Sequence, residues 1–163
     1  NLNKNFLINL SLIFFIFFFD RFSKIYVINL DKKSLGSEIF SSKFLNIHLI
    51  WNEGIAFGLL SFSQITLYNF ITMIIIVVIL FVLIMILNNK SFKRIALVMI
   101  FGGALGNLYD RIFFRAVPDF IDFHINDFHW FIFNVADIFI TIGVFFMILL
   151  ELVDNNIKNN EKN

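Results

Sequence analysis

The sequence contains no cysteine and a single proline among its 163 residues. The lack of cysteine excludes a disulfide-stabilised fold, a thiol nucleophile and any thiolate metal site. Charged residues make up only 15% of the chain and nearly cancel, to a net charge of +1, which gives no reason to expect nucleic-acid binding. Apolar residues make up 59%, against roughly 45–50% in a soluble domain. This excess argues against a disordered or ordinary soluble chain and predicts an integral membrane protein.

Four segments are long and apolar enough to cross a bilayer, which takes about 20 residues. They are predicted at residues 6–28, 65–87, 94–114 and 130–150. The first could be a cleavable signal peptide, but no small-residue cleavage site follows it, so we expect a retained span. No linker or internal repeat divides the chain. The expected fold is a single domain over residues 1–163, of the membrane all-α class, with four transmembrane helices.

Basic residues in short segments predict the orientation of these spans. They occur at Lys4, in the link at 88–94 and in the C-terminal tail, and such segments stay in the cytoplasm. Both termini are therefore expected to be cytoplasmic. The first outer link alternates apolar and polar residues around 44–51, which predicts a small extracytoplasmic β-element between spans one and two. The second outer link is interpreted as an acidic loop with Asp122 and Asp127 in solvent.

Polar residues inside the spans are candidates for function, because charge is costly in a bilayer. Asp20 and Lys24 lie one helical turn apart and are expected to form a structural ion pair. The third span contains a polar cluster of Asn107, Asp110 and Arg111, in which we expect the two opposite charges to offset each other. Both groups are interpreted first as structural networks.

Asp137 differs, because no lysine or arginine lies near it in the fourth span. It stands about seven residues into that span, or ~10 Å below the outer boundary. Asp119 follows the third span in an apolar segment and can fold back toward Asp137. Two carboxylates in a partly dehydrated site can share one proton, as in an aspartic-protease dyad. A small proton-coupled transporter or channel subunit could use Asp137 and Asp110 as relay groups, so the residues alone leave both functions open.

Five motifs then occur in order along the chain. They are Asp20-x-x-x-Lys24, Asn52-x-Gly54-x-Ala56-Phe57, Gly102-Gly103-Ala104-x-Gly106-Asn107-x-x-Asp110-Arg111, Val117-x-Asp119-Phe120-x-Asp122 and Phe133-Asn134-x-Ala136-Asp137. Together, on a four-span chain, they resemble the lipoprotein signal peptidase (signal peptidase II) family of bacterial aspartic peptidases. The resemblance covers about residues 6–150.

The resemblance implies an endopeptidase that removes the signal peptide from diacylglyceryl-modified prolipoproteins, just before the lipidated cysteine. It implies Asp119 and Asp137 as the catalytic pair. Six other positions are implied to bind substrate or support the site, namely Asn52, Gly54, Asn107, Asp110, Arg111 and Asn134. The implied location is the bacterial cytoplasmic (inner) membrane, with the active site near the periplasmic face. No cofactor is implied, the expected partners are prolipoprotein substrates and membrane lipid, and a monomer is expected.

Two residues depart from the family pattern. Ile55 stands where the family usually has a small residue, and Pro118 precedes Asp119 where the family commonly has valine. Neither changes a catalytic carboxylate, so we expect activity to survive. The three histidines match no zinc-binding pattern, and we expect no metal site.

Overall fold

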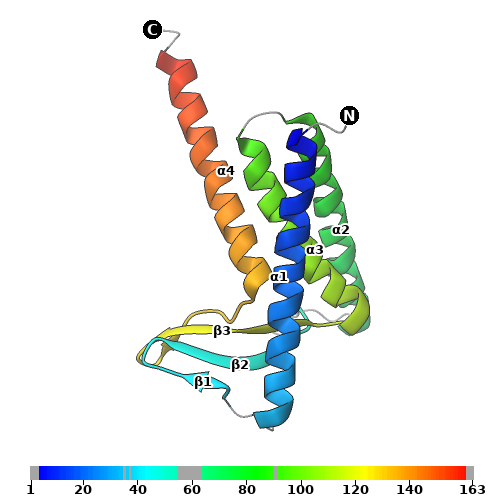
Figure 1. Cartoon of the computed structure of the whole chain (residues 1–163), viewed down its shortest axis with the longest axis vertical. Coiled ribbons are helices and arrows are strands. Elements are labelled where there is room, and N and C mark those ends of the chain that lie inside the picture. The colour runs from blue at the N-terminus through cyan, green and yellow to red at the C-terminus, as the bar shows by residue number, and fades with distance from the viewer. Residues whose placement is uncertain (1–3, 35, 37, 55–63, 90–91, 161–163) are drawn as a thin grey trace.

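The computed structural model describes residues 4–34, 36, 38–54, 64–89 and 92–160. The helices and strands follow one another along the chain (Figure 1) in the order α1 (Lys4–Ser34), β1 (Phe40–Ser41), β2 (Leu45–Asn52), α2 (Gln64–Asn88), α3 (Lys93–Phe114), β3 (Val117–Ile125), β4 (Phe128–His129) and α4 (Val135–Asn160). All four helices are long and apolar enough to cross a membrane, which confirms the expected spans. Ile55, one of the two departures from the family pattern, lies outside the described residues.

Three helix ends differ from the predicted ones by more than two residues, and one of them is the end of α4, which runs to Asn160 and not to 150. α1 continues past residue 28 to Ser34. α4 begins at Val135, not at 130, because apolar residues before it, Trp130 and Phe133, bond to the backbone of β3 and do not continue the helix. The backbone of Phe133 bonds to that of Ile121 in β3, at N–O distances of 2.8 and 3.1 Å. Hydropathy cannot separate an apolar strand from the helix that follows it, so the prediction merged the two.

The strands form one antiparallel sheet in the order β1-β2-β3-β4. The predicted β-element supplies only β1 and β2, and the other half comes from the second outer link. Interpreting that link as a loop was wrong, since Asp122 lies in β3 and is only 2% exposed. Asp127 is exposed in the turn before β4, as expected. Asp119 and Asp122 point to opposite faces of β3, and acids on both faces hide the alternation that identifies a strand.

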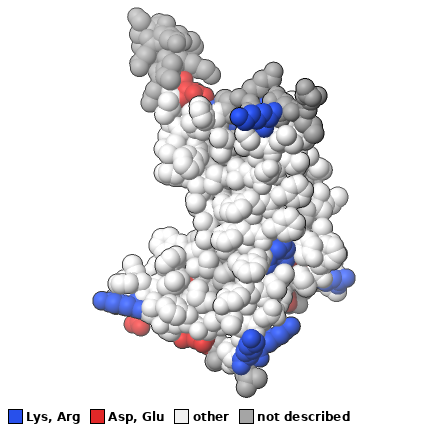
Figure 2. All heavy atoms as spheres, in the orientation of Figure 1, with Lys and Arg blue, Asp and Glu red and all other residues white. Residues whose placement is uncertain are grey.

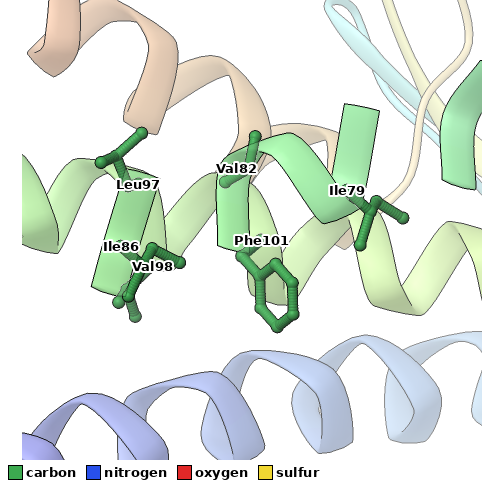
Figure 3. Close-up of a cluster of buried hydrophobic side chains, with 6 residues drawn as sticks. All are labelled: Ile79, Val82, Ile86, Leu97, Val98 and Phe101. Carbon is green, nitrogen blue, oxygen red and sulfur yellow. The ribbon is translucent and has the colours of Figure 1, made fainter. Parts of the chain in front are cut away.

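α3 is the helix that contacts each of the other three. It packs against α2 through an apolar cluster (Figure 3) that consists of Ile79, Val82, Ile86, Leu97, Val98 and Phe101. Its contact with α1 depends on glycine, because a Cβ on Gly106 would lie 2.5 Å from a carboxylate oxygen of Asp20. Gly103 faces α4 in the same way, and a Cβ there would lie 2.5 Å from the carbonyl oxygen of Ala136. The small residues therefore bring α1 and α4 close to α3.

A second apolar cluster joins α1, the sheet and α4 through Val27, Phe120 and Val135. Phe120 follows Asp119 in the sequence and Val135 follows Asn134, so this cluster positions the candidate site. Elsewhere large apolar side chains are exposed, such as Phe81 in α2 at 61% and Phe145 in α4 at 60%. In Figure 2 charged residues gather toward the two ends of the molecule, with a mostly uncharged band between them. An exposed apolar band of this kind is suited to contact with lipid.

The sheet lies at one end of the helical bundle (Figure 1). The start of α1 and the end of α4 both lie at the opposite end. The residues predicted to perform chemistry come from the sheet and from the helix ends nearest to it, so the site lies far from both termini.

Candidate active site

The start of α4 fixes the position of Asp137. The side chain of Asn134 accepts the backbone N–H of Asp137 at 3.1 Å, and the carboxylate of Asp137 accepts the backbone N–H of Asn134 at 3.1 Å. This reciprocal arrangement is a capping box, which satisfies two free N–H groups of the helix. Asp137 is thus the third residue of α4, and its expected place seven residues into a span was wrong. The Asn-x-x-Asp spacing is the sequence signal that could have located this helix start.

Three asparagines hold the two candidate acids. The amide of Asn134 donates to Asp119 at 2.6 Å, so this one residue touches both acids. Asn52, the last residue of β2, donates to the other oxygen of Asp119 at 2.9 Å. Asn107 in α3 donates to Asp137 at 2.8 Å. The structure therefore brings together side chains from β2, β3, α3 and α4 that are far apart in the sequence.

Both acids line one cavity of about 300 Å³. Its polar lining consists of Asn52, Asn107, Arg111, Asp119, Asn134 and Asp137. Among the described residues, neither acid takes part in an ion pair. The pKa of Asp119 is raised to about 6, chiefly by burial and in smaller part by the charge of Asp137, against the opposing effect of the amide donors of Asn52 and Asn134. Such an environment lets a carboxyl hold a proton near neutral pH.

The predicted ion pair between Asp20 and Lys24 is present, at 2.9 Å, within a larger buried network. Lys24 also lies 2.7 Å from Asp110 in α3, and Arg21 lies 3.1 Å from Asp20 and 2.5 Å from Asp110. Two acids and two bases therefore balance between α1 and α3. Sequence reasoning missed Arg21, and the expected pairing of Asp110 with Arg111 was wrong. Adjacent residues of a helix point in different directions, so Asp110 faces α1 while Arg111 faces the cavity.

The ion network is connected to the candidate acids. Lys24 donates to the side-chain oxygen of Asn107 at 2.8 Å, which leaves the amide NH₂ of Asn107 to donate to Asp137. Asp20 accepts the backbone N–H of Ala136, in the first turn of α4, at 3.0 Å. A negative charge at a helix N-terminus is favourable, because the free N–H groups carry partial positive charge. The network thus positions both α4 and the asparagine that contacts Asp137.

Arg111 and Gly54 meet beyond the end of β2. The guanidinium carbon of Arg111 lies 5.6 Å from the ring centre of Tyr68, and its Nη1 is buried with no hydrogen-bond partner among the described residues. Gly54 has a φ of +75°, and a Cβ there would lie 2.7 Å from that Nη1. Its N–H donates to Asn52 at 2.7 Å. The turn therefore requires glycine, and it leaves room for a cationic donor in the wall of the cavity.

Asp137 also lines a second, apolar cavity of about 440 Å³. The other lining residues are Phe123, Trp130, Phe131, Phe133, Ile138, Thr141 and Ile142. Asp137 thus lies between a polar and an apolar cavity.

Pro118 is buried opposite Trp51 near the start of β3, a place where a strand tolerates a missing N–H.

Comparison with known proteins identifies the family. The family model described as signal peptidase (SPase) II matches residues 12–153. The chain is 52% identical over 160 residues to the lipoprotein signal peptidase of Pelagibacter ubique (strain HTCC1062), covering 98% of this chain and 96% of that protein. It is 38% identical over 152 residues to the lipoprotein signal peptidase of Anaplasma marginale (strain Florida), covering 92% and 87%.

A solved structure shares the fold. It is described as a bacterial membrane enzyme determined by the in meso method at 1.9 Å resolution, and it superposes with a TM-score of 0.66 at 35% identity, covering 88% of this chain and 91% of the other. These findings support a peptidase and give no support to the alternative of a proton-coupled transporter. The chain therefore belongs to the signal peptidase II family and is a multi-pass membrane peptidase.

Proposed function

We propose that this peptidase cleaves diacylglyceryl-modified prolipoproteins just before the lipidated cysteine, with Asp119 and Asp137 as its catalytic pair. The observation that carries the proposal is that Asn134 bonds to both acids in a cavity that both acids line. The substrate is inferred from the lipoprotein signal peptidases to which the chain is similar.

The two carboxyls can activate a water molecule between them. One carboxyl is ionised and the other is protonated. The ionised carboxylate takes a proton from the water molecule while the oxygen of that water attacks the scissile carbonyl carbon, and the protonated carboxyl donates its proton to the carbonyl oxygen. Collapse of the tetrahedral intermediate then breaks the C–N bond, and the leaving nitrogen takes a proton from the carboxyl that received it. No metal or other cofactor is needed to balance these steps.

The amide donors around the pair support this assignment. Asn52 and Asn134 each donate to Asp119, while Asn107 and the Asn134 backbone N–H donate to Asp137. These bonds hold both carboxylates in fixed orientations without giving either of them a cationic partner. A neighbouring ammonium would stabilise the doubly ionised state, in which no shared proton remains.

Substrate binding is assigned to residues at the cavity wall. The buried Nη1 of Arg111, which has no partner among the described residues, can donate to a peptide carbonyl of the substrate. Asn52 and Gly54 form the adjoining turn at the end of β2, where the backbone can align an extended peptide. Asp110 takes no direct part and supports the site through Lys24.

The apolar cavity on the other side of Asp137 supports the proposal that the substrate carries a lipid group. It is lined almost entirely by aromatic and aliphatic side chains and has about 440 Å³ of space. A lining of this kind can accept acyl CH₂ groups from the lipid without leaving a buried polar group unpaired. We assign the polar cavity to the peptide and the apolar cavity to part of the diacylglyceryl group.

We further propose that the enzyme lies in the bacterial inner membrane as a monomer, with both termini in the cytoplasm and the sheet on the periplasmic side. The start of α1, the start of α3 and the end of α4, which carry basic residues such as Lys4 and Lys93, lie at the end of the bundle away from the sheet (Figure 1). The site would then open where the substrate's lipidated cysteine lies, at the outer surface of the membrane.

The test is cleavage of a purified diacylated prolipoprotein by the Asp119→Asn and Asp137→Asn variants. Each should lower turnover by about 10²–10⁴-fold, because neither amide can take up or deliver the shared proton. Asp127→Asn is the matched control, since that acid is exposed in the neighbouring turn. Near-normal turnover in both variants, with folding verified by thermal unfolding, would refute the catalytic assignment.

A further inference from the structure

The hairpin of β3 and β4 carries a second cluster of polar side chains, outside the cavity of the candidate acids. It consists of Asp122, His124 and His129, and one ligand atom from each lies within 4.8 Å of the others. His124 and His129 are directly opposite each other in the two strands, with ring centres 5.0 Å apart. Asp122 and His124 are two residues apart in β3, so both point to the same face of the sheet.

Two atoms of this cluster lack a partner within the described part of the chain. His129 Nδ1 lies 2.8 Å from one carboxylate oxygen of Asp122, but the other oxygen, Oδ1, is buried without a hydrogen bond. The Nδ1 of His124 is buried without a bond in the same part of the structure. Asp122 itself is only 2% exposed. Buried polar atoms nearly always have a partner, so a simple ion pair between Asp122 and His129 leaves both of these atoms unexplained.

From this geometry we propose that Asp122, His124 and His129 bind a divalent transition metal ion of the zinc class. Imidazole nitrogen and carboxylate oxygen are ligands that Zn²⁺ takes, whereas Ca²⁺ and Mg²⁺ prefer oxygen alone. Around a tetrahedral Zn²⁺ with bonds of about 2.0–2.1 Å, ligand atoms lie roughly 3.3 Å apart. The ligand atoms of these three side chains lie within 4.8 Å of one another, so rotations about side-chain bonds can bring them to this spacing.

This site was not expected from the sequence, because its spacing, Asp-x-His followed by His five residues later, matches no common zinc motif. The β-hairpin creates it by placing His129 against His124. The metal would fasten β3 to β4 between two residues of the candidate active site. Asp119 lies three residues before Asp122, and Asn134 lies five residues after His129. We therefore assign the ion a structural role and no part in peptide hydrolysis.

The test is metal binding by the full chain, purified in detergent without a histidine tag and freed of metal with a chelator. Titration with Co²⁺, followed by its visible absorption, should show one saturable site per chain, and Zn²⁺ should displace the Co²⁺. Zn²⁺ should also raise the thermal unfolding midpoint. Because the chain has no cysteine, no thiol competes for the ion. A wild-type protein that binds neither ion saturably would overturn the proposal.

His124→Gln is the decisive variant. His124 is not part of the bond between Asp122 and His129, so this substitution leaves that pair in place. It should lower Zn²⁺ affinity at least about tenfold, as the loss of groups at metal sites commonly does. His48→Gln, at the one histidine of the sequence outside this cluster, in β2, should leave affinity unchanged. Equal affinity in the wild type and the His124→Gln variant, with circular dichroism showing both folded, would also overturn the proposal.

Discussion

Asparagines, and not cations, are the partners of the two candidate catalytic acids. Asn52 and Asn134 bond to Asp119, and Asn107 and Asn134 bond to Asp137. A neutral amide stabilises a carboxylate less strongly than an ammonium or guanidinium does. The cations of the neighbouring network are instead paired with Asp20 and Asp110. The acids of this region therefore form two groups. Asp20 and Asp110 are balanced by cations, whereas Asp119 and Asp137 lie among neutral amides, where a carboxyl can hold a proton.

The raised pKa of Asp119, about 6, predicts the pH dependence of cleavage. The pair needs one proton, which is present below this pKa and lost above it. We therefore expect kcat/KM to fall by about tenfold per pH unit above pH 6.

Asn52→Ala removes a donor that favours the charged form of Asp119, so the falling limb of the kcat/KM profile should move to higher pH. A kcat/KM profile of both proteins checks this, and an unmoved limb would contradict the assignment of Asp119.

Gly54 allows a test of how Arg111 is positioned. Gly54→Ala should raise KM several-fold, because the new Cβ would lie 2.7 Å from the guanidinium and displace it. Gly36→Ala is the control, since Gly36 has a similar φ of +79° but a Cβ added there would meet no atom within 4 Å. Both variants share the backbone strain, so steady-state kinetics compared between them isolate the contact with Arg111. Equal KM values in the two variants would argue against a substrate-binding role for Arg111.

The sequence motifs named every polar residue that lines the cavity of the candidate acids but only some of their contacts. The ion pair of Asp20 and Lys24 was predictable because it follows from helical spacing within one helix. The pairing of Asp110 with Arg21 was not, because it depends on how α1 is rotated against α3. The bridging position of Asn134 likewise depends on the path of β3, a segment that was predicted to be a loop.

At the scale of elements, the contact between α1 and α3 combines glycine with buried charge. Gly106 brings the helices together at Asp20, and two acids and two bases then fill the interface. Such a network contributes little net stability when it is complete, yet removing one member leaves an uncompensated charge in an apolar region. The packing of α1 against α3 is therefore specified by the need to balance the buried charges between them.

This balance predicts the effect of Lys24→Met. The single variant should lower the free energy of unfolding by about 3–5 kcal/mol, because Asp20 and Asp110 then share only Arg21. Adding Asp110→Asn restores neutrality, so the double variant should lose less than the sum of the two single changes. Denaturant unfolding in detergent measures all three.

Lys93→Met is the control for that cycle. Lys93 contacts Glu151 and Asp154, whose side chains are 54% and 46% exposed, so this pairing is solvated. Its loss should cost about 0–1 kcal/mol. A Lys24→Met variant no less stable than the Lys93→Met variant would show that the buried network is not needed for the fold.

Element boundaries show where hydropathy stops being informative. The four helices follow from their long apolar runs, and α2, which contains no charge, ends within one residue of its prediction. The start of α4 was missed because the residues before it, such as Phe133, which pairs with Ile121, are as apolar as those of a span. β3 was missed for a different reason, which is that acids on both of its faces hide its periodicity, and one of these acids belongs to the site.

At the scale of the whole molecule, the orientation can be tested directly because the chain has no cysteine. Single cysteines can be introduced by Lys43→Cys near the sheet and Leu152→Cys near the end of α4, both at exposed positions. In spheroplasts a membrane-impermeant maleimide should label the Lys43→Cys variant at once and the Leu152→Cys variant only after lysis. The unsubstituted chain is the blank, and the reverse pattern would invert the proposed orientation.

The length of α1 has a consequence for the whole molecule. Its 31 residues span about 46 Å at about 1.5 Å per residue, while the hydrocarbon core of a bilayer is about 30 Å thick. One continuous helix thus crosses the membrane and, through Val27, contacts Phe120 beside Asp119. The distance of β3, the strand that carries the candidate acid Asp119, from the far end of the bundle is therefore set by the length of α1. Changing the bilayer thickness therefore changes the depth at which a substrate must present its bond.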